Sequence, residues 1–452
     1  MIGCICRWAS RFVAAVILVL GVAPAQAQDQ GGIVEVISPS GIKAWLRQDS
    51  SIPLLAIDFQ FQGGGAIIPV EKAGAAVLAA RMLTEGAGEW DGEAFRQALA
   101  DNAISLGFDA GRDSFSGRLT TLTVNRDLAV RLLRAALTAP RLEEAALRQE
   151  KAALVTERRR NLTRPNSIAF RNWFRTAFKG HPYSTSLHGT PESVANVQSG
   201  DVAGFLQKVL TRRGLIVGVA GDIAPADLAQ VLEQAFGSLP DRAPPTDLPQ
   251  AVPPPAGVMV IQQPSQQSVL VFGHDGIGRD DPDWYAASLV MQVLGGSTFT
   301  SRLGAEVREK RGLAYGIGAS LSPYKSGALV MGRTATRNEA AAETAQIIRD
   351  EWRRLAEGGP SADELAEAKS YLIGSFPLSL DSTDAIASVL VQMQDFNLGR
   401  DYWSQRADKF SSVDLATARR VAKKILKPDA LLFAVVGSPD HLTATLPAAS
   451  AQ

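Results

Sequence analysis

The chain has 452 residues, of which 46% are hydrophobic and 20% are charged, as in an ordinary globular protein. This composition excludes disordered and fibrous proteins, and the length is sufficient for about two to four domains. Lysine plus arginine and aspartate plus glutamate both number 46, so the formal net charge is zero. Nucleic-acid binders normally carry a basic excess or a basic stripe, so no nucleic-acid partner is expected.

The first 27 residues have the features of an export signal. Arg7 and Arg11 supply a positive start, and residues 12–22 form an apolar run of 11 residues, which is too short to cross a bilayer as a helix. Residues 25–27 read AQA, a small-x-small pattern that predicts cleavage after Ala27. A short buried helix is the alternative, but the flanking residues favour a signal. We therefore expect export to the periplasm of a Gram-negative bacterium.

Cysteine usage agrees with this expectation. Cys4 and Cys6 both lie in the predicted signal, so the processed chain would have no disulfide and no cysteine metal ligand. No later stretch reaches 18 consecutive apolar residues, which is about the minimum for a spanning helix. We therefore expect no stable membrane insertion.

A proline-rich segment divides the remaining chain into two parts of similar length. Residues 240–255 contain seven prolines in 16 residues, and proline is excluded from helix interiors and central strands. We interpret residues 240–256 as a linker between an N-terminal domain at 28–239 and a C-terminal domain at 257–445. A long surface loop inside one domain is the alternative.

The segments at the ends of the two parts resemble each other. Residues 197–222 and residues 413–438 both run from an amphipathic helix, through a polar turn, into an apolar strand. The two strands end at Gly221 and Gly437. Such a long internal repeat indicates duplication of a whole domain, although a coincidental helix-turn-strand pattern remains the alternative.

Each part mixes strands with long helices. Residues 54–61 and 113–122 show the alternation of half-buried strands. Residues 70–83 predict a buried helix, residues 142–162 predict a long one, and Asn125 is a candidate helix cap. Strands and helices do not alternate strictly, so we expect an α+β fold with two homologous halves, each a mainly antiparallel sheet packed against helices.

The sharpest motif lies in the second part. Residues 295–303 read GGSTFTSRL and residues 304–315 read GAEVREKRGLAY. This pattern resembles the C-terminal half of pitrilysin/insulinase-type peptidases, the inverted zincins. In that family a glycine-rich turn precedes a helix start and then an arginine and a tyrosine seven residues apart, which Arg308 and Tyr315 match. We expect Arg308 late in a helix, Gly312 in a left-handed conformation that ends it, and Tyr315 at the start of the next strand.

The resemblance implies roles for these residues. In the family, the arginine and tyrosine reach a zinc site on another domain and donate hydrogen bonds to substrate carbonyl oxygens. Such donors contribute about 3–4 kcal/mol each in acyl-transfer enzymes. The resemblance also makes Gly295, Gly296 and Ser297 candidate substrate-binding residues. The alternative is that Arg308 is a solvated helix residue and that Tyr315 is packed in the core.

The zinc motif of the same family is altered in the first part. Its H-x-x-E-H pattern falls on residues 77–81, where Val77 replaces the first histidine, Ala80 the glutamate and Arg81 the second histidine. None of the three can bind zinc or act as a base at neutral pH.

The acidic residues that follow the altered motif are retained. Glu150 and Glu157 share one helix face, with Glu157 at the position of the third zinc ligand in the family. Our hypothesis is that Arg81 takes the place of the cation and pairs with Glu157 or Glu150. A charged face on a long helix is the alternative.

The remaining residues offer no replacement metal site. The four histidines, His181, His188, His274 and His441, form no pair at helical i, i+4 spacing. We expect no cofactor in this chain and zinc in a homologous partner chain that carries H-x-x-E-H. The predicted function is the non-zinc subunit of a heterodimeric peptidase that acts on peptides, inactive by itself. A scaffold or peptide-binding protein without catalytic function is the alternative.

Overall fold

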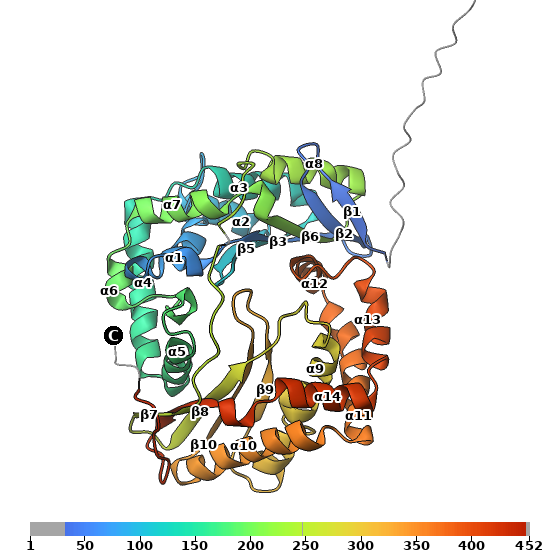
Figure 1. Cartoon of the computed structure of the whole chain (residues 1–452). Coiled ribbons are helices and arrows are strands. Elements are labelled where there is room, and N and C mark those ends of the chain that lie inside the picture. The colour runs from blue at the N-terminus through green and yellow to red at the C-terminus, as the bar shows by residue number, and fades with distance from the viewer. Residues whose placement is uncertain (1–31, 246, 449–452) are drawn as a thin grey trace, which may run out of the picture.

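The structure is a computed structural model that describes residues 32–245 and 247–448, arranged as two halves that each contain one β-sheet (Figure 1). The predicted export signal at residues 1–27 lies outside the described residues. Residues 240–256, where described, contain neither helix nor strand and connect the two halves. Within the described ranges, no helix combines the length and the apolar character that a membrane crossing requires.

The first half contains a six-stranded sheet with the order β1-β2-β6-β3-β5-β4. The strands are β1 (Val34–Ile37), β2 (Lys43–Gln48), β3 (Leu54–Gln62), β4 (Ser105–Ala110), β5 (Ser114–Leu122) and β6 (Leu215–Gly221). β2 and β6 are parallel, and the other neighbouring strands are antiparallel. The strands predicted at 54–61 and 113–122 are confirmed as β3 and β5, which pair with each other.

The second half contains a five-stranded sheet with the order β7-β11-β8-β10-β9. The strands are β7 (Gly257–Gln262), β8 (Gln267–Asp275), β9 (Ile317–Ser322), β10 (Leu329–Arg337) and β11 (Leu432–Gly437). β7 and β11 are parallel and the rest are antiparallel, so the sheet repeats the topology of β2-β6-β3-β5-β4. The expected α+β fold with two homologous halves is therefore confirmed.

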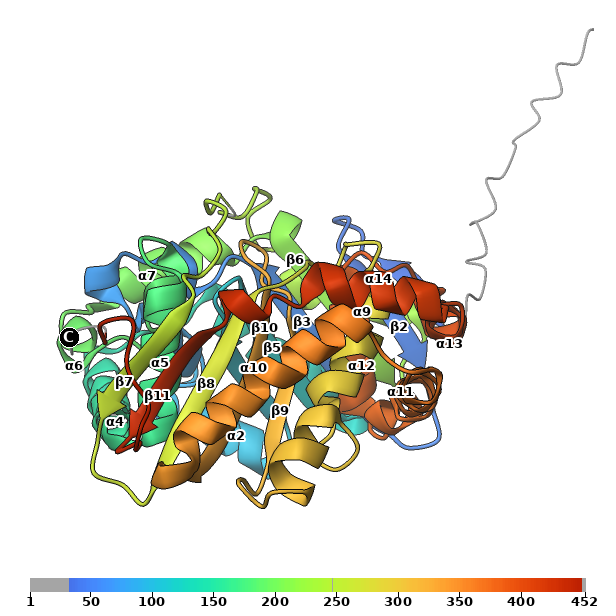
Figure 2. The ribbon, with the colours of Figure 1, turned by 60° about the horizontal axis from the view of Figure 1, so that its bottom comes forward.

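Helices cover both sheets. The first half contains α1 (Ala75–Met82), α2 (Gly92–Asp101), α3 (Arg126–Thr138), α4 (Glu144–Thr163), α5 (Pro165–Ala177), α6 (Pro191–Ala195), α7 (Ser199–Val209) and α8 (Pro225–Phe236). The second half contains α9 (Trp284–Met291), α10 (Ala341–Gly358), α11 (Ala362–Gly374), α12 (Thr383–Asp395), α13 (Tyr402–Ser411) and α14 (Leu415–Ile425). Figure 2 shows α10 crossing the strands of the second sheet on the outer side of the molecule.

Two helices pack on the sheet of the opposite half. In α5, the indole of Trp173 is fully buried and donates to the carbonyl of Leu432 in β11 at 3.0 Å. In α12, the amide of Gln394 donates to the carbonyl of Val217 in β6 at 2.8 Å. The approach of α12 requires Gly218, because a Cβ there would lie 2.3 Å from the carbonyl oxygen of Ala387. The two halves are thus joined by reciprocal contacts as well as by the linker.

Two local predictions need correction. The helix predicted at 70–83 is shorter, because Gly74 adopts a φ of +103° and α1 begins only after it. Asn125 lies at the N-cap position of α3 but does not cap the helix with its side chain. Its amide donates instead to the carbonyl of Asn102 at 2.7 Å, so a tertiary contact replaces the expected cap.

Candidate functional site

The altered motif lies where α1 packs against α4 in the first half. Val77 and Ala80 are buried in the hydrophobic core of this half, so their side chains contribute packing and no polar group. Arg81 is partly exposed and extends to the carboxylates of α4.

Arg81 pairs with both carboxylates. Its Nη2 atom donates to Oε2 of Glu157 at 2.7 Å, and its Nη1 atom lies 3.6 Å from Oε2 of Glu150. The hydrogen bond from Arg81 holds the pKa of Glu157 below its usual value, against the opposing effect of burial. Arg81 thus pairs with both carboxylates that the hypothesis named as alternatives, while its place as a substitute for the cation stays a prediction.

These residues do not fit a zinc ion. The two carboxylates are engaged by a permanent cation, and Val77 and Ala80 carry no ligand atom. Across residues 32–245 and 247–448, no group of three or more histidine, cysteine, aspartate or glutamate side chains is placed to hold a metal. The first half therefore lacks a metal-dependent hydrolytic centre of the family's kind in its described residues.

The second candidate group lies on the turn that leads into β9. A short π-helical segment, η7 (Gly304–Glu309), carries Arg308 in its last turn, and Gly312 has a left-handed φ of +59°. These positions agree with the expected helix end. Tyr315 lies in the loop two residues before β9 rather than at the start of the strand.

Arg308 lies between two aromatic rings. Its guanidinium carbon is 4.2 Å from the ring centroid of Phe299 and 5.0 Å from that of Tyr315, distances typical of cation–π contacts. Tyr315 is 89% exposed and Phe299 is 63% exposed, which is unusual for large side chains. The arginine and tyrosine are thus brought together, with the tyrosine ring open to solvent and the arginine side chain 24% exposed.

The glycine-rich turn shapes this group from the other side. Gly295 packs against β9, where a Cβ atom would lie 2.7 Å from the amide nitrogen of Ala319. The hydroxyl oxygen of Ser297 accepts hydrogen bonds from the amides of Phe299 and Thr300 at 3.3 and 3.4 Å. Ser297 therefore fixes the loop that positions Phe299.

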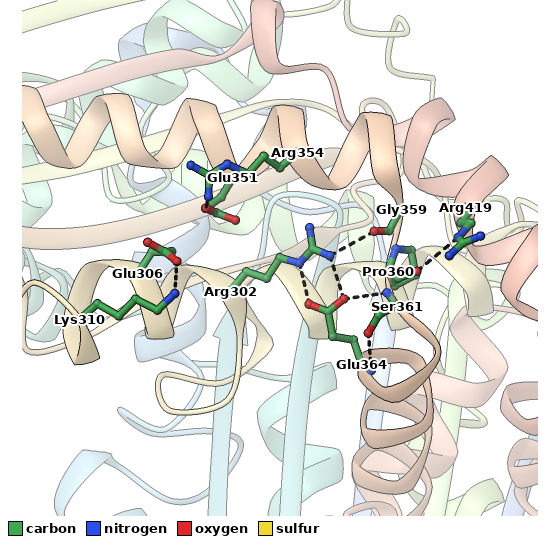
Figure 3. Close-up of polar contacts among 10 residues, drawn as sticks. All are labelled: Arg302, Glu306, Lys310, Glu351, Arg354, Gly359, Pro360, Ser361, Glu364 and Arg419. Carbon is green, nitrogen blue, oxygen red and sulfur yellow. Dashed lines mark hydrogen bonds and ion pairs between the residues drawn. The ribbon is translucent and has the colours of Figure 1, made fainter.

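An ion pair between Arg302 and Glu364 anchors the segment that carries Arg308 to α11. The Nε and Nη2 atoms of Arg302 donate to the two carboxylate oxygens of Glu364 at 2.7 and 2.8 Å, and Nη2 also donates to the carbonyl of Gly359 at 3.1 Å (Figure 3). The hydrogen bond from Arg302 is the main cause that lowers the pKa of Glu364, so the ionised form of the carboxylate is favoured in this pair. The pair ties the segment before η7 to the N-terminal turn of α11.

A groove of about 990 Å³ runs beside Tyr315. Gly295 and Gly296 line it together with the backbone of β9, and Phe170 and Phe174 of α5 line its other side. β9 is the last strand of its sheet. An elongated ligand in this groove would contact Tyr315 and residues from both halves.

Phe299 and Arg302 were missed by the reasoning from sequence. Both lie inside the GGSTFTSRL motif, so the signal was present, but the pattern does not reveal which side chain stacks on Arg308 or which anchors the segment. Only the fold shows that Glu364, 62 residues along the chain, meets Arg302.

Comparison with known proteins agrees with this geometry. Residues 196–372 match the family model described as the Peptidase M16 inactive domain. A Helicobacter pylori protein named "Non-peptidase homolog YmxG" is 25% identical over 342 residues, covering 76% of this chain and 79% of that protein. A mitochondrial-processing peptidase subunit beta from Lentinula edodes is 23% identical over 332 residues, covering 70% of each chain.

A solved structure shares the fold nearly throughout. The crystal structure of a peptidase M16 inactive domain from Pseudomonas fluorescens superposes with a TM-score of 0.85 at 25% identity, covering 92% of this chain and all of that one. The resemblance to pitrilysin/insulinase-type peptidases is therefore confirmed: residues 196–372 match the inactive domain of M16 peptidases, and 92% of the chain shares the fold of a solved M16 inactive domain.

Proposed function

We propose that this chain is the non-zinc subunit of a two-chain periplasmic zinc peptidase. A homologous partner with H-x-x-E-H would bring the zinc and the base, and this chain would bring Arg308 and Tyr315 to the carbonyl oxygens of a bound peptide. The contrast between the two sites carries the proposal: Arg81 neutralises the altered motif internally, whereas Tyr315 is 89% exposed beside Arg308.

The exposed pair has suitable chemistry for this role. A guanidinium and a phenol both donate hydrogen bonds, and donors aimed at a developing oxyanion lower the barrier of acyl transfer. Arg308 lies against Phe299 and Tyr315, and the carboxylate of the adjacent Glu309, 3.4 Å from its Nε, engages only one edge of the guanidinium. The groove beside Tyr315, of about 990 Å³, has room for a peptide segment.

A scaffold without catalytic function is the second candidate. It is favoured by the name "Non-peptidase homolog" that the Helicobacter pylori relative carries. A scaffold, however, has no requirement for a phenol hydroxyl at position 315, and this difference separates the two candidates.

The test is reconstitution with the homologous H-x-x-E-H chain, followed by peptide hydrolysis with and without a chelator. Tyr315→Phe should lower kcat/KM by about 100-fold while leaving the affinity between the chains unchanged. Tyr371→Phe is the matched control, because Tyr371 is also exposed, at 51%, but lies on α11. Equal activity of Tyr315→Phe and the wild type would reject the catalytic role and favour the scaffold.

A further inference from the structure

A second groove, of about 920 Å³, lies in the first half between α4, α5 and the segment around α6. Figure 1 shows α4 and α5 side by side on this flank of the molecule. The basic residues that line the groove are Arg158, Arg171, Arg175 and Lys179. Neither Arg81 nor Glu150 lines it, so the groove is distinct from the altered motif.

Arg158 is the most informative of these residues. The residue is only 8% exposed, and its Nε atom is buried without any hydrogen-bond partner. The adjacent carboxylate of Glu157 already accepts from Arg81 at 2.7 Å. Burial lowers the pKa of Arg158, which means that the surroundings penalise its charge. A buried guanidinium of this kind is costly unless an anion satisfies it.

Arg171 adds to the positive charge of the groove. Burial and the charges of Arg158 and Arg175 lower the pKa of Arg171, so the arginines lie close enough to repel one another. Glu71 and Glu192 also line the groove, but both are exposed. Among the described residues, neither carboxylate forms an ion pair with Arg158 or Arg171.

We propose that this groove binds a phosphate-bearing anion. Guanidinium groups match the oxygen geometry of phosphate with paired hydrogen bonds. The groove is also lined by Thr185 and Ser186, whose hydroxyls can donate to further oxygens. Its volume exceeds that of a single ion, so a diphosphate or a larger phosphorylated molecule fits it.

The first test measures the binding of inorganic pyrophosphate to the full chain by calorimetry, with sodium chloride at equal ionic strength as the reference. Arg171→Gln should weaken binding by about tenfold or more, as expected when one charge-assisted contact is lost. Arg160→Gln is the matched control, because Arg160 is exposed on the same helix as Arg158 and does not line the groove. Absence of saturable binding, or equal weakening in both variants, would overturn the proposal.

A second variant keeps the proposal testable if affinity is difficult to measure. Arg158→Met removes a buried guanidinium whose Nε has no hydrogen-bond partner, so it should raise the Tm in anion-free buffer and abolish the rise in Tm that pyrophosphate gives the wild type. A Tm rise that persists in Arg158→Met would reject the assignment.

The source of the phosphate is settled with vesicles of equal parts phosphatidylglycerol and phosphatidylcholine. Co-sedimentation that depends on Arg171 would assign the phosphate to a lipid headgroup. Pyrophosphate binding without co-sedimentation would assign it to a soluble molecule. Either result supports a phosphate site. If neither pyrophosphate nor the vesicles bind, the groove is not a phosphate site.

Discussion

The two halves share one topology but differ in the contacts that their candidate arginines, Arg81 and Arg308, make. In the first half, Arg81 is paired with Glu157 and Glu150 inside the chain. In the second half, Arg308 contacts aromatic rings that are themselves exposed, and its nearest carboxylate, Glu309, is the adjacent residue, 3.4 Å from its Nε. The two arginines are similarly exposed, at 30% for Arg81 and 24% for Arg308, but Arg81 bridges two carboxylates of another helix, whereas Arg308 lies against two exposed aromatic rings.

This difference indicates which half of the fold keeps side chains available to contact another molecule. Glu150 and Glu157 share one face of α4 and would repel each other, and the permanent cation of Arg81 removes that repulsion. The Arg308 group needs no such replacement because its support comes from behind, through Arg302 and Glu364. The comparison therefore predicts that the Arg302–Glu364 pair stabilises the second half more than the partly exposed Arg81 pair stabilises the first.

The largest expected effect concerns a buried histidine that supports the second half. His274 is fully buried, its Nδ1–H donates to the carbonyl of Asp275 at 2.7 Å, and its Nε2 accepts from the indole of Trp352 in α10 at 3.0 Å. The backbone amide of Lys427 also donates to Nε2 at 3.4 Å, so protonation of Nε2 would oppose two donors. Burial lowers the pKa of His274 to about 4.

Because the unfolded histidine titrates near 6.5, the neutral form is favoured in the folded state. Stability is therefore complete above about pH 6.5, falls as the pH drops, and levels off below about 4, with a total loss of about 3 kcal/mol. Urea unfolding between pH 7.5 and 4 should show this loss, and His274→Gln should remove most of it. An identical pH profile in the variant would contradict the prediction; His188→Gln is the comparison for general histidine titration, because burial also lowers the pKa of His188.

Sequence patterns predicted much of this half and of its counterpart. The alternation of β3 and β5 and the spacing from Arg308 to Tyr315 are local properties, and local patterns survive folding. The packing of α5 and α12 on the opposite sheets was not predictable, because an amphipathic face does not specify which sheet it covers. The stacking of Phe299 depends on the geometry of the loop between it and Arg308, and the burial of Arg158 depends on contacts with other elements. Gly74 delays the start of a helix that hydrophobicity alone would begin at residue 70.

The intermediate effect concerns the support of the Arg308 group. Arg302→Ala removes a two-point ion pair whose side chains are 22% and 31% exposed, and it should lower the free energy of unfolding by about 2 kcal/mol. Urea unfolding measures the loss, and hydrogen exchange should show faster opening of residues 302–312. Arg311→Ala is the control, because Glu306 keeps Lys310 as a second cation when Arg311 is removed, so the loss should be less than about 1 kcal/mol. Similar losses in the two variants would mean that Arg302 gives no special support.

The smallest effect concerns the internally paired group of the first half. Arg81→Met keeps the apolar stem but leaves Glu157 and Glu150 without their cation, and because all three side chains are 19–33% exposed, the expected loss is only about 1 kcal/mol at neutral pH. The folded pKa of Glu157 is lowered by Arg81, so the contribution is complete above the unfolded value of 4.5 and disappears as the pH falls through the folded value. The difference between Arg81→Met and the wild type should therefore shrink in acid, and adding Glu157→Gln should recover part of the loss at neutral pH. Arg96→Met is the control: it breaks a pair with Glu85 in which the arginine is 55% exposed, and it should lower the free energy of unfolding by less. A larger loss in Arg96→Met, or a loss in Arg81→Met that does not change with pH, would mean that Arg81 does not act as a replacement cation. The two halves would then differ less than their contacts indicate.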